Sequence, residues 1–232
     1  MKKIYSLLLT FMIGLTVFGQ MPMLGDKAPE FEAQSTTGDI SFPGDFYGKW
    51  KILFSHPADF TPVCSTEIIE LSFLQEEFES RNTKLVILST DGLNSHLEWV
   101  KSLESIDYKN MGEIKIEFPL VSDVGLDISK KYGMIHPNNN STKDVRAVFI
   151  INPEDKISAI FYYPDNVGRN IDEILRTLIA LQEVYTNKKL VPANWLEGEK
   201  LLLNSPSSKE EAKKMESKKN LSSLTWYLWY EK

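Results

Sequence analysis

The single cysteine of this chain, Cys64, is the side chain best suited to chemistry. It follows Thr61 and Pro62, a pair typical of a helix start, because threonine can cap a helix and proline is tolerated at the first helical position. Cys64 then falls in the first helical turn, where free backbone N–H groups and the helix dipole favour an anion. The pattern predicts a reactive thiolate, with a buried, inert cysteine as the alternative.

A thiolate at this position needs a cation as well, because a helix end alone contributes only about 1 kcal/mol. Arg146 and Arg169 are the candidates, since each lies at the end of an expected element. His56, at the end of the strand before Cys64, is either a general base for the thiol or a histidine satisfied by neighbouring backbone. The three histidines are scattered and show no spacing typical of a metal site, so no metal or other cofactor is expected.

The elements that must position these residues alternate between strand and helix patterns. The expected strands cover residues 50–55, 85–90, 118–122, 145–151 and 157–163, the last two forming a hairpin. The expected helices cover residues 64–80, 93–103 and 125–132, followed by a long amphipathic helix capped by Asn170. This order predicts an α/β fold in which helices flank a central mixed sheet.

The N-terminal twenty residues differ from the rest of the chain. Lys2 and Lys3 precede a short apolar run, a composition typical of a secretory signal peptide over residues 1–20. The run is short for a membrane span, although an uncleaved membrane anchor is the alternative. We therefore expect a protein exported to the periplasm or secreted, with its signal peptide cleaved.

The C-terminal residues 189–232 also differ, and are too few to be expected to fold alone. A capping box at Ser208 predicts a short helix, and the aromatic run at residues 225–230 has strand propensity. We expect this tail to form a dimerisation domain that covers a partner subunit in a homodimer or higher homo-oligomer. Residues 21–188 then form the main domain.

The charge of the chain excludes some functions. Loss of the two N-terminal lysines would change the formal net charge from −6 to −8. A chain this acidic is a poor candidate for binding nucleic acid or anionic lipid, and small neutral substrates suit it better. The lysines of residues 213–219 are interpreted as a solvated helix face.

The segment Pro57-x-x-x-Thr61-x-x-Cys64 resembles the active-site signature of the peroxiredoxins. Residues 145–149 resemble the strand that carries the family's active-site arginine. Residues 163–170 and 191–195 are similar to the long-tailed one-cysteine class of the alkyl hydroperoxide reductase/thiol-specific antioxidant family. The resemblance implies a thioredoxin-like fold over residues 21–188, with a small C-terminal peroxiredoxin domain.

The resemblance also implies the roles of the residues that match. Cys64 is the peroxidatic nucleophile, Thr61 hydrogen-bonds the thiolate and the peroxide, and Pro57 shields the pocket from water. Arg146 favours the thiolate and stabilises the charge that develops as the peroxide bond breaks.

Three further residues receive supporting roles from the resemblance. Glu67 holds Arg146 through a charge-assisted hydrogen bond, Arg169 is a second pocket cation, and His56 lies near the active site.

The expected reaction is antioxidant reduction of hydrogen peroxide or an alkyl hydroperoxide. Cys64 becomes a sulfenic acid, and because the chain has no second cysteine, an external thiol must reduce it. That thiol belongs to a thioredoxin-like protein or to a small molecule. The rival functions are a non-enzymatic chaperone or interaction module on the same fold, and a thiol-disulfide oxidoreductase, which would normally carry Cys-x-x-Cys.

Overall fold

The computed structural model describes residues 21–135 and 141–231. The predicted signal peptide, residues 1–20, lies outside these ranges. Within them, no helix has both the length and the apolar character needed to cross a membrane.

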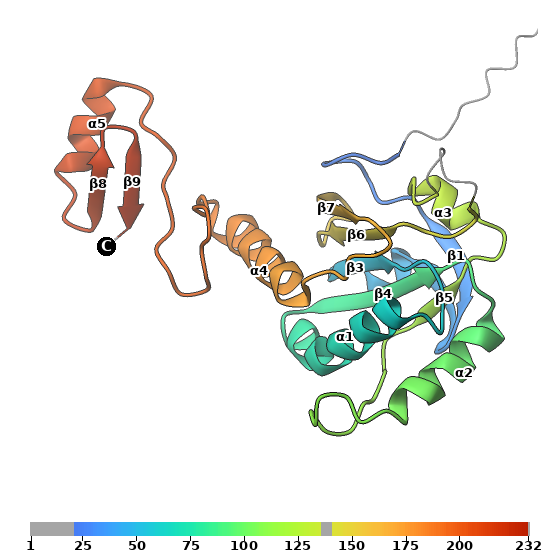
Figure 1. The fold of residues 1–232 in the computed structure, drawn as a ribbon. Helices are drawn as coiled ribbons and strands as arrows, with labels where there is room; N and C mark the ends of the chain where they lie inside the picture. The colour runs from blue at the N-terminus through green and yellow to red at the C-terminus, as the bar shows by residue number, and fades with distance from the viewer. Residues whose placement is uncertain (1–20, 136–140, 232) are drawn as a thin grey trace, which may run out of the picture.

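A seven-stranded mixed sheet forms the centre of the molecule, with the strand order β2-β1-β5-β4-β3-β6-β7 (Figure 1). The strands are β1 (Phe31–Ser35), β2 (Gly38–Phe42), β3 (Trp50–Ser55), β4 (Thr83–Ser89), β5 (Leu120–Ser122), β6 (Arg146–Ile151) and β7 (Ile157–Tyr163). Strands β3, β4 and β5 are parallel, whereas β6 pairs antiparallel with β3 and β1 pairs antiparallel with β5. The predicted mixed sheet and the hairpin of β6 and β7 are confirmed.

Helices cover both faces of the sheet, and the sheet separates its hydrophobic core into two clusters. The helices are α1 (Pro62–Ser80), α2 (Leu93–Glu104), α3 (Asp127–Lys131) and α4 (Ile171–Asn187), with a short 3-10 helix η1 (Gly44–Phe46). Strand β3 is buried along its whole length. Its side chains alternate between the two faces, so Ile52 and Phe54 join the cluster formed with α1, α2 and α4, and Leu53 joins the cluster that includes α3. This is the pattern of a central strand covered on both faces.

The end of the chain forms a small separate unit that lies beyond α4 and apart from the large sheet (Figure 1). It consists of α5 (Lys209–Glu216), β8 (Leu221–Thr225) and β9 (Leu228–Glu231). The predicted capping box is present in part, since the Ser208 hydroxyl accepts a hydrogen bond from the Glu211 backbone N–H at 3.1 Å.

The strand propensity expected for residues 225–230 is confirmed at Thr225 and at residues 228–230, with a turn between them. The chain turns back at Trp226 and Tyr227, so that β9 pairs antiparallel with β8. The turn allows Trp229 to enter the small core formed with Ala212 and Leu221. The indole N–H of Trp229 donates to the carbonyl of Trp226 at 2.8 Å, which satisfies the polar atom of this buried ring. The hairpin therefore keeps most of the run in strands and buries one of its aromatic side chains.

Asp144, just before β6, is a buried acid whose ionisation affects stability. It is 1% exposed, and burial raises its pKa from 3.8 to about 7, with the charges of Asp123 and Asp91 adding to the shift. Because the folded-state pKa lies above the unfolded value, the folded protein binds the proton more tightly. Stability is therefore lost as the pH rises from about 4 to about 7.

We predict that Asp144→Asn stabilises the protein above pH 7, because the amide needs no proton to remain neutral. The expected gain at about pH 8 is about 3 kcal/mol in the free energy of unfolding, and it disappears near pH 4. Denaturant unfolding followed by circular dichroism across this range measures it. Asp39→Asn, at an exposed position, is the matched control and should change nothing. Parallel pH profiles for wild type and Asp144→Asn would contradict the prediction.

Candidate active site

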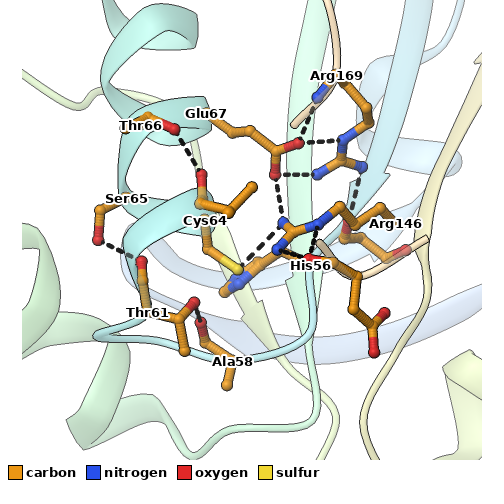
Figure 2. Close-up of polar contacts among 12 residues, drawn as sticks. His56, Ala58, Thr61, Cys64, Ser65, Thr66, Glu67, Arg146 and Arg169 are labelled. Atoms are coloured by element: carbon orange, nitrogen blue, oxygen red, sulfur yellow. Dashed lines mark hydrogen bonds and ion pairs between the residues drawn. The ribbon is translucent and has the colours of Figure 1, made fainter. Parts of the chain in front are cut away.

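Cys64 lies at the start of α1, in the loop-to-helix connection that leaves the end of β3 (Figure 2). Thr61 occupies the N-cap position with extended backbone angles (φ −107°, ψ 146°), and Pro62 begins the helix. Cys64 is therefore the third helical residue, as predicted, and its side chain is fully buried. At this position it faces the positive end of the helix dipole.

Arg146 is the cation that contacts the thiol. Its Nη1 donates to Cys64 Sγ at 3.3 Å and to Glu67 Oε2 at 2.7 Å. The other side of the guanidinium is held by the carbonyl oxygen of Asp165, which accepts from Nε at 3.0 Å and from Nη2 at 2.7 Å. Arg146 is the first residue of β6, and the pairing of β6 with β3 brings it to the strand end that precedes Cys64. The guanidinium is thus fixed from both sides.

Glu67, one turn after Cys64 on α1, links Arg146 to Arg169 (Figure 2). Its Oε1 accepts from the Arg169 backbone N–H at 2.8 Å and from Nε at 2.9 Å, and its Oε2 accepts from Nη2 at 2.7 Å. All three side chains are buried. Two guanidinium groups around one carboxylate leave one net positive charge beside the thiol, and a Cys64 thiolate balances it.

Arg169 is linked to the site through Glu67, whereas Arg146 donates directly to the sulfur. The Nη1 of Arg169 donates to the buried carbonyl oxygens of Ser55 at 2.7 Å, at the end of β3, and of Ala147 at 2.9 Å, near the start of β6. Its guanidinium also lies over the ring of Phe54, 3.3 Å from the centroid. Burial lowers the pKa of Arg169, and the hydrogen bonds to Glu67 oppose that shift. Arg169 therefore joins the two strand ends to the Glu67 carboxylate.

Thr61 and Pro57 form the turn in front of the thiol. The Thr61 hydroxyl donates to the carbonyl oxygen of Ala58 at 2.8 Å, which tightens the turn, and Pro57 is buried. The expected hydrogen bond from Thr61 to the Cys64 sulfur is therefore not formed among the described residues, because the hydroxyl hydrogen points to Ala58. The hydroxyl must rotate to donate to a bound peroxide.

His56 is fully buried, and neither ring nitrogen has a hydrogen-bond partner among the described residues. The backbone of Ala58 lies near the ring and opposes the fall in its pKa, but it does not complete a hydrogen bond, so the backbone does not satisfy His56 as fully as expected. Burial lowers its pKa to about 3, which the charge of Asp59 opposes. The ring is neutral at pH 7 and packs against Trp99, with centroids 5.0 Å apart.

Sequence reasoning missed Asp59 and His96, which also lie beside this turn. His96 Nδ1 is 2.8 Å and 3.0 Å from the two carboxylate oxygens of Asp59, and both side chains are buried. The histidines are therefore not all scattered, since His56 and His96 both face Asp59. One signal was present: His96, Trp99 and Leu103 follow helical spacing, so a histidine on the buried face of α2 required a polar partner.

A thioredoxin-like sheet and a lone cysteine at a helix start, held by a buried arginine, define a thiol peroxidase. Two family models match the chain: the AhpC/TSA family over residues 24–160, and the C-terminal domain of 1-Cys peroxiredoxin over residues 180–219. The chain belongs to the AhpC/TSA family, the peroxiredoxins, and it is an oxidoreductase of the thiol peroxidase type.

Relatives match over nearly the whole of their length. A peroxiredoxin of Methanosarcina mazei is 48% identical over 215 residues, which cover 91% of this chain and 98% of the relative. A peroxiredoxin of Thermotoga maritima is 42% identical over 218 residues, covering 92% and 99%. The solved structure of a yeast mitochondrial 1-Cys peroxiredoxin has a TM-score of 0.79 at 35% identity, covering 91% of this chain and 99% of that chain. A cysteine-to-serine variant of Arenicola marina peroxiredoxin 6 has a TM-score of 0.78 at 33% identity, covering 90% and 97%.

Proposed function

We propose that this chain reduces hydrogen peroxide and organic hydroperoxides through Cys64, in antioxidant defence. The observation that carries the proposal is the Arg146 N–H donated to Cys64 Sγ in a buried pocket at a helix start. The thiolate attacks one peroxide oxygen and forms an S–O bond while the O–O bond breaks. The leaving hydroxide or alkoxide takes up a proton and departs as water or alcohol, and Cys64 becomes a sulfenic acid.

The surrounding residues receive roles that follow from their contacts. Arg146 stabilises negative charge on the sulfur and on the oxygens as the peroxide bond breaks. Thr61 orients the peroxide with its hydroxyl, and Pro57 keeps water from the pocket. Glu67 holds Arg146 in place, and Arg169 fixes the Glu67 carboxylate.

His56 is proposed as a neutral pocket residue rather than as a base for the thiol. A base would have to accept the thiol proton, and the pKa of about 3 leaves the ring a very weak acceptor.

Reduction of the sulfenic acid requires an external thiol, because Cys64 is the single cysteine of the 232 residues. A first thiol forms a mixed disulfide with Cys64 and releases water, and a second thiol then releases the cysteine. The yeast relative is described with glutathione and thioredoxin systems. We propose a thioredoxin-like protein or a small thiol for this chain as well.

Stopped-flow mixing with hydrogen peroxide, followed by turnover with an added thiol, tests this function. We expect oxidation of Cys64 far faster than that of free cysteine, and catalytic peroxide consumption once a reduced thioredoxin or glutathione is supplied. A rate no faster than that of free cysteine would contradict the proposal and favour a non-enzymatic role.

We further propose a homodimer in which the C-terminal unit, residues 189–232, covers a partner subunit. The β8–β9 hairpin exposes Leu224 (76%), Trp226 (60%) and Tyr227 (50%), an apolar group that water solvates poorly. Multi-angle light scattering on the full chain is expected to give a dimer or larger oligomer. A Leu224→Ser/Trp226→Ser variant should be smaller, whereas Tyr47→Ser, at another exposed aromatic position, should not. A monomeric wild type would contradict the proposal.

For localisation, we infer export with cleavage of residues 1–20. The support is the composition of that segment, in which two lysines precede a short apolar run. N-terminal sequencing of the native protein tests it. A mature N-terminus near Met21 is expected, and an intact N-terminus in the membrane fraction would indicate the anchored form instead.

A further inference from the structure

The buried pair of Asp59 and His96 has a hydrogen-bonding pattern that limits its protonation. His96 Nε2 lies 3.1 Å from the backbone carbonyl oxygen of Val121, and Nδ1 lies 2.8 Å and 3.0 Å from the carboxylate oxygens of Asp59. A carbonyl oxygen accepts hydrogen bonds and has no proton to donate, and an ionised carboxylate likewise accepts only. Two arrangements make both contacts hydrogen bonds: both ring nitrogens carry a hydrogen beside an ionised Asp59, or a protonated Asp59 donates to a bare Nδ1. An imidazole is ordinarily more basic than a carboxylate, which favours the first arrangement.

We propose that His96 is an imidazolium cation, and that its buried ion pair with Asp59 is a positioning device for the turn that leads to Cys64. The positioning role rests on the proposed peroxidase function, whereas the charge of His96 rests on its contacts and on the basicity of imidazole. Neither residue contacts the sulfur among the described hydrogen bonds, so both act through the turn.

The pair ties the turn to three other parts of the fold. Asp59 lies in the middle of the turn, and its backbone N–H donates to Asp91 Oδ2 at 2.7 Å, after β4. Its carboxylate binds His96 on α2, and His96 in turn binds Val121 on β5. The residue after Asp59, Phe60, has a positive φ of 53°, a conformation that non-glycine residues rarely adopt. Such a turn keeps one shape only when surrounding contacts impose it.

A metal ion is the alternative positive group at this place. One ligand atom from each of His56, Asp59 and His96 lies within 4.8 Å of the others, a grouping that could bind a divalent cation such as zinc. Geometry favours the proton, because Nδ1 of His96 is already within hydrogen-bond distance of both Asp59 oxygens.

The positive charge of His96 helps to keep the neighbouring His56 neutral. Asp59 Oδ1 is 3.7 Å from His56 Nε2, so the carboxylate faces both histidines, but its hydrogen bonds go to His96. The charges of His96 and Arg169 add to burial in lowering the pKa of His56. Of the two histidines that face one carboxylate, His96 holds the proton.

NMR of the full-length protein labelled with ¹⁵N-histidine tests the charge of His96 directly. At pH 7 we expect both ring nitrogens of His96 to be protonated. For His56 we expect one protonated and one bare nitrogen. Single histidine substitutions assign the resonances. A His96 ring with one bare nitrogen would overturn the proposal. The proposal would also be overturned by stoichiometric zinc in the purified protein, if the His96 resonance shifts when a chelator removes the zinc.

A double-substitution cycle tests the positioning role. His96→Asn leaves the Asp59 carboxylate buried without its partner, and Asp59→Asn removes the carboxylate that holds the His96 ring, so each should lower the rate constant of Cys64 oxidation by about tenfold or more. The double variant carries no unpaired charge and can form an amide pair, so it should recover most of that loss. Lys101→Asn removes an exposed ion-pair partner on the same helix and should leave the rate unchanged.

Each outcome of this cycle is decisive for the positioning role. Losses that simply add in the double variant would overturn it. If a single variant fails to fold, the double variant is compared directly with wild type. A rate close to that of wild type then supports the positioning role of the pair, and a low rate contradicts that role. A wild-type protein that does not react with peroxide would refute the proposed function, while the NMR result would still decide the charge.

Discussion

Cys64→Ser is expected to abolish peroxide reduction, lowering the second-order rate constant by at least about 10⁴-fold. A serine hydroxyl remains protonated beside Arg146 and cannot form a stable sulfenic-acid equivalent, so both the attack and the intermediate are lost. Stopped-flow mixing with hydrogen peroxide measures the rate, and mass spectrometry shows whether an oxygen atom is added. Residual fast oxidation in the variant would show that Cys64 is not the reacting group.

The control for this prediction must separate the effect of the thiol itself from the effect of the groups that surround it. In Cys64→Ser/Ser65→Cys the chain keeps one thiol, moved by one residue along α1 and away from the Arg146 contact. We expect this variant to react only as fast as free cysteine. A rate close to that of wild type would contradict the claim that Arg146 and the helix start activate the thiol. Serine nearly matches cysteine in size at this buried position, so unfolding should show an intact fold for Cys64→Ser.

Glu67→Gln is expected to have the largest effect on stability, about 3–5 kcal/mol, because it leaves two buried guanidinium groups without their shared carboxylate. Glu67 accepts four hydrogen bonds from Arg146 and Arg169, and a neutral amide oxygen replaces only part of that interaction. Because Arg146 also loses its orientation toward Cys64 Sγ, peroxide reduction should fall by about 100-fold or more. Denaturant unfolding and stopped-flow kinetics measure the two effects.

Glu70→Gln provides the matched control on the same helix. Glu70 pairs with Lys109 at the surface, where Lys109 is 60% exposed, and such exposed pairs contribute at most about 1 kcal/mol. We expect Glu70→Gln to retain wild-type kinetics. If Glu67→Gln were as stable and as active as Glu70→Gln, the buried carboxylate would not be what organises the two arginines.

Local sequence determined the helix start and the alternation of elements. Thr61 and Pro62 specify where α1 begins, because their backbone preferences act within a few residues, and this alone places Cys64 in the first turn. The apolar periods likewise predicted strands and helices close to those observed, and the β6–β7 hairpin followed from its turn residues. The strand propensity of residues 225–230 was confirmed in part, because Thr225 and residues 228–230 lie in strands, but it did not predict the turn at Trp226 and Tyr227 that pairs β9 with β8.

The charged contacts of the site depend on tertiary structure. Strand pairing brings Arg146 to a cysteine 82 positions earlier, and only the folded chain shows that Arg169 binds Glu67 rather than the sulfur. The same holds for His96, which meets Asp59 because α2 packs beside the turn. A sequence shows which groups can carry charge, but their partners depend on which elements pack together. The sequence by itself therefore determined the reacting thiol and its helix, and the tertiary structure decided which buried charges surround them.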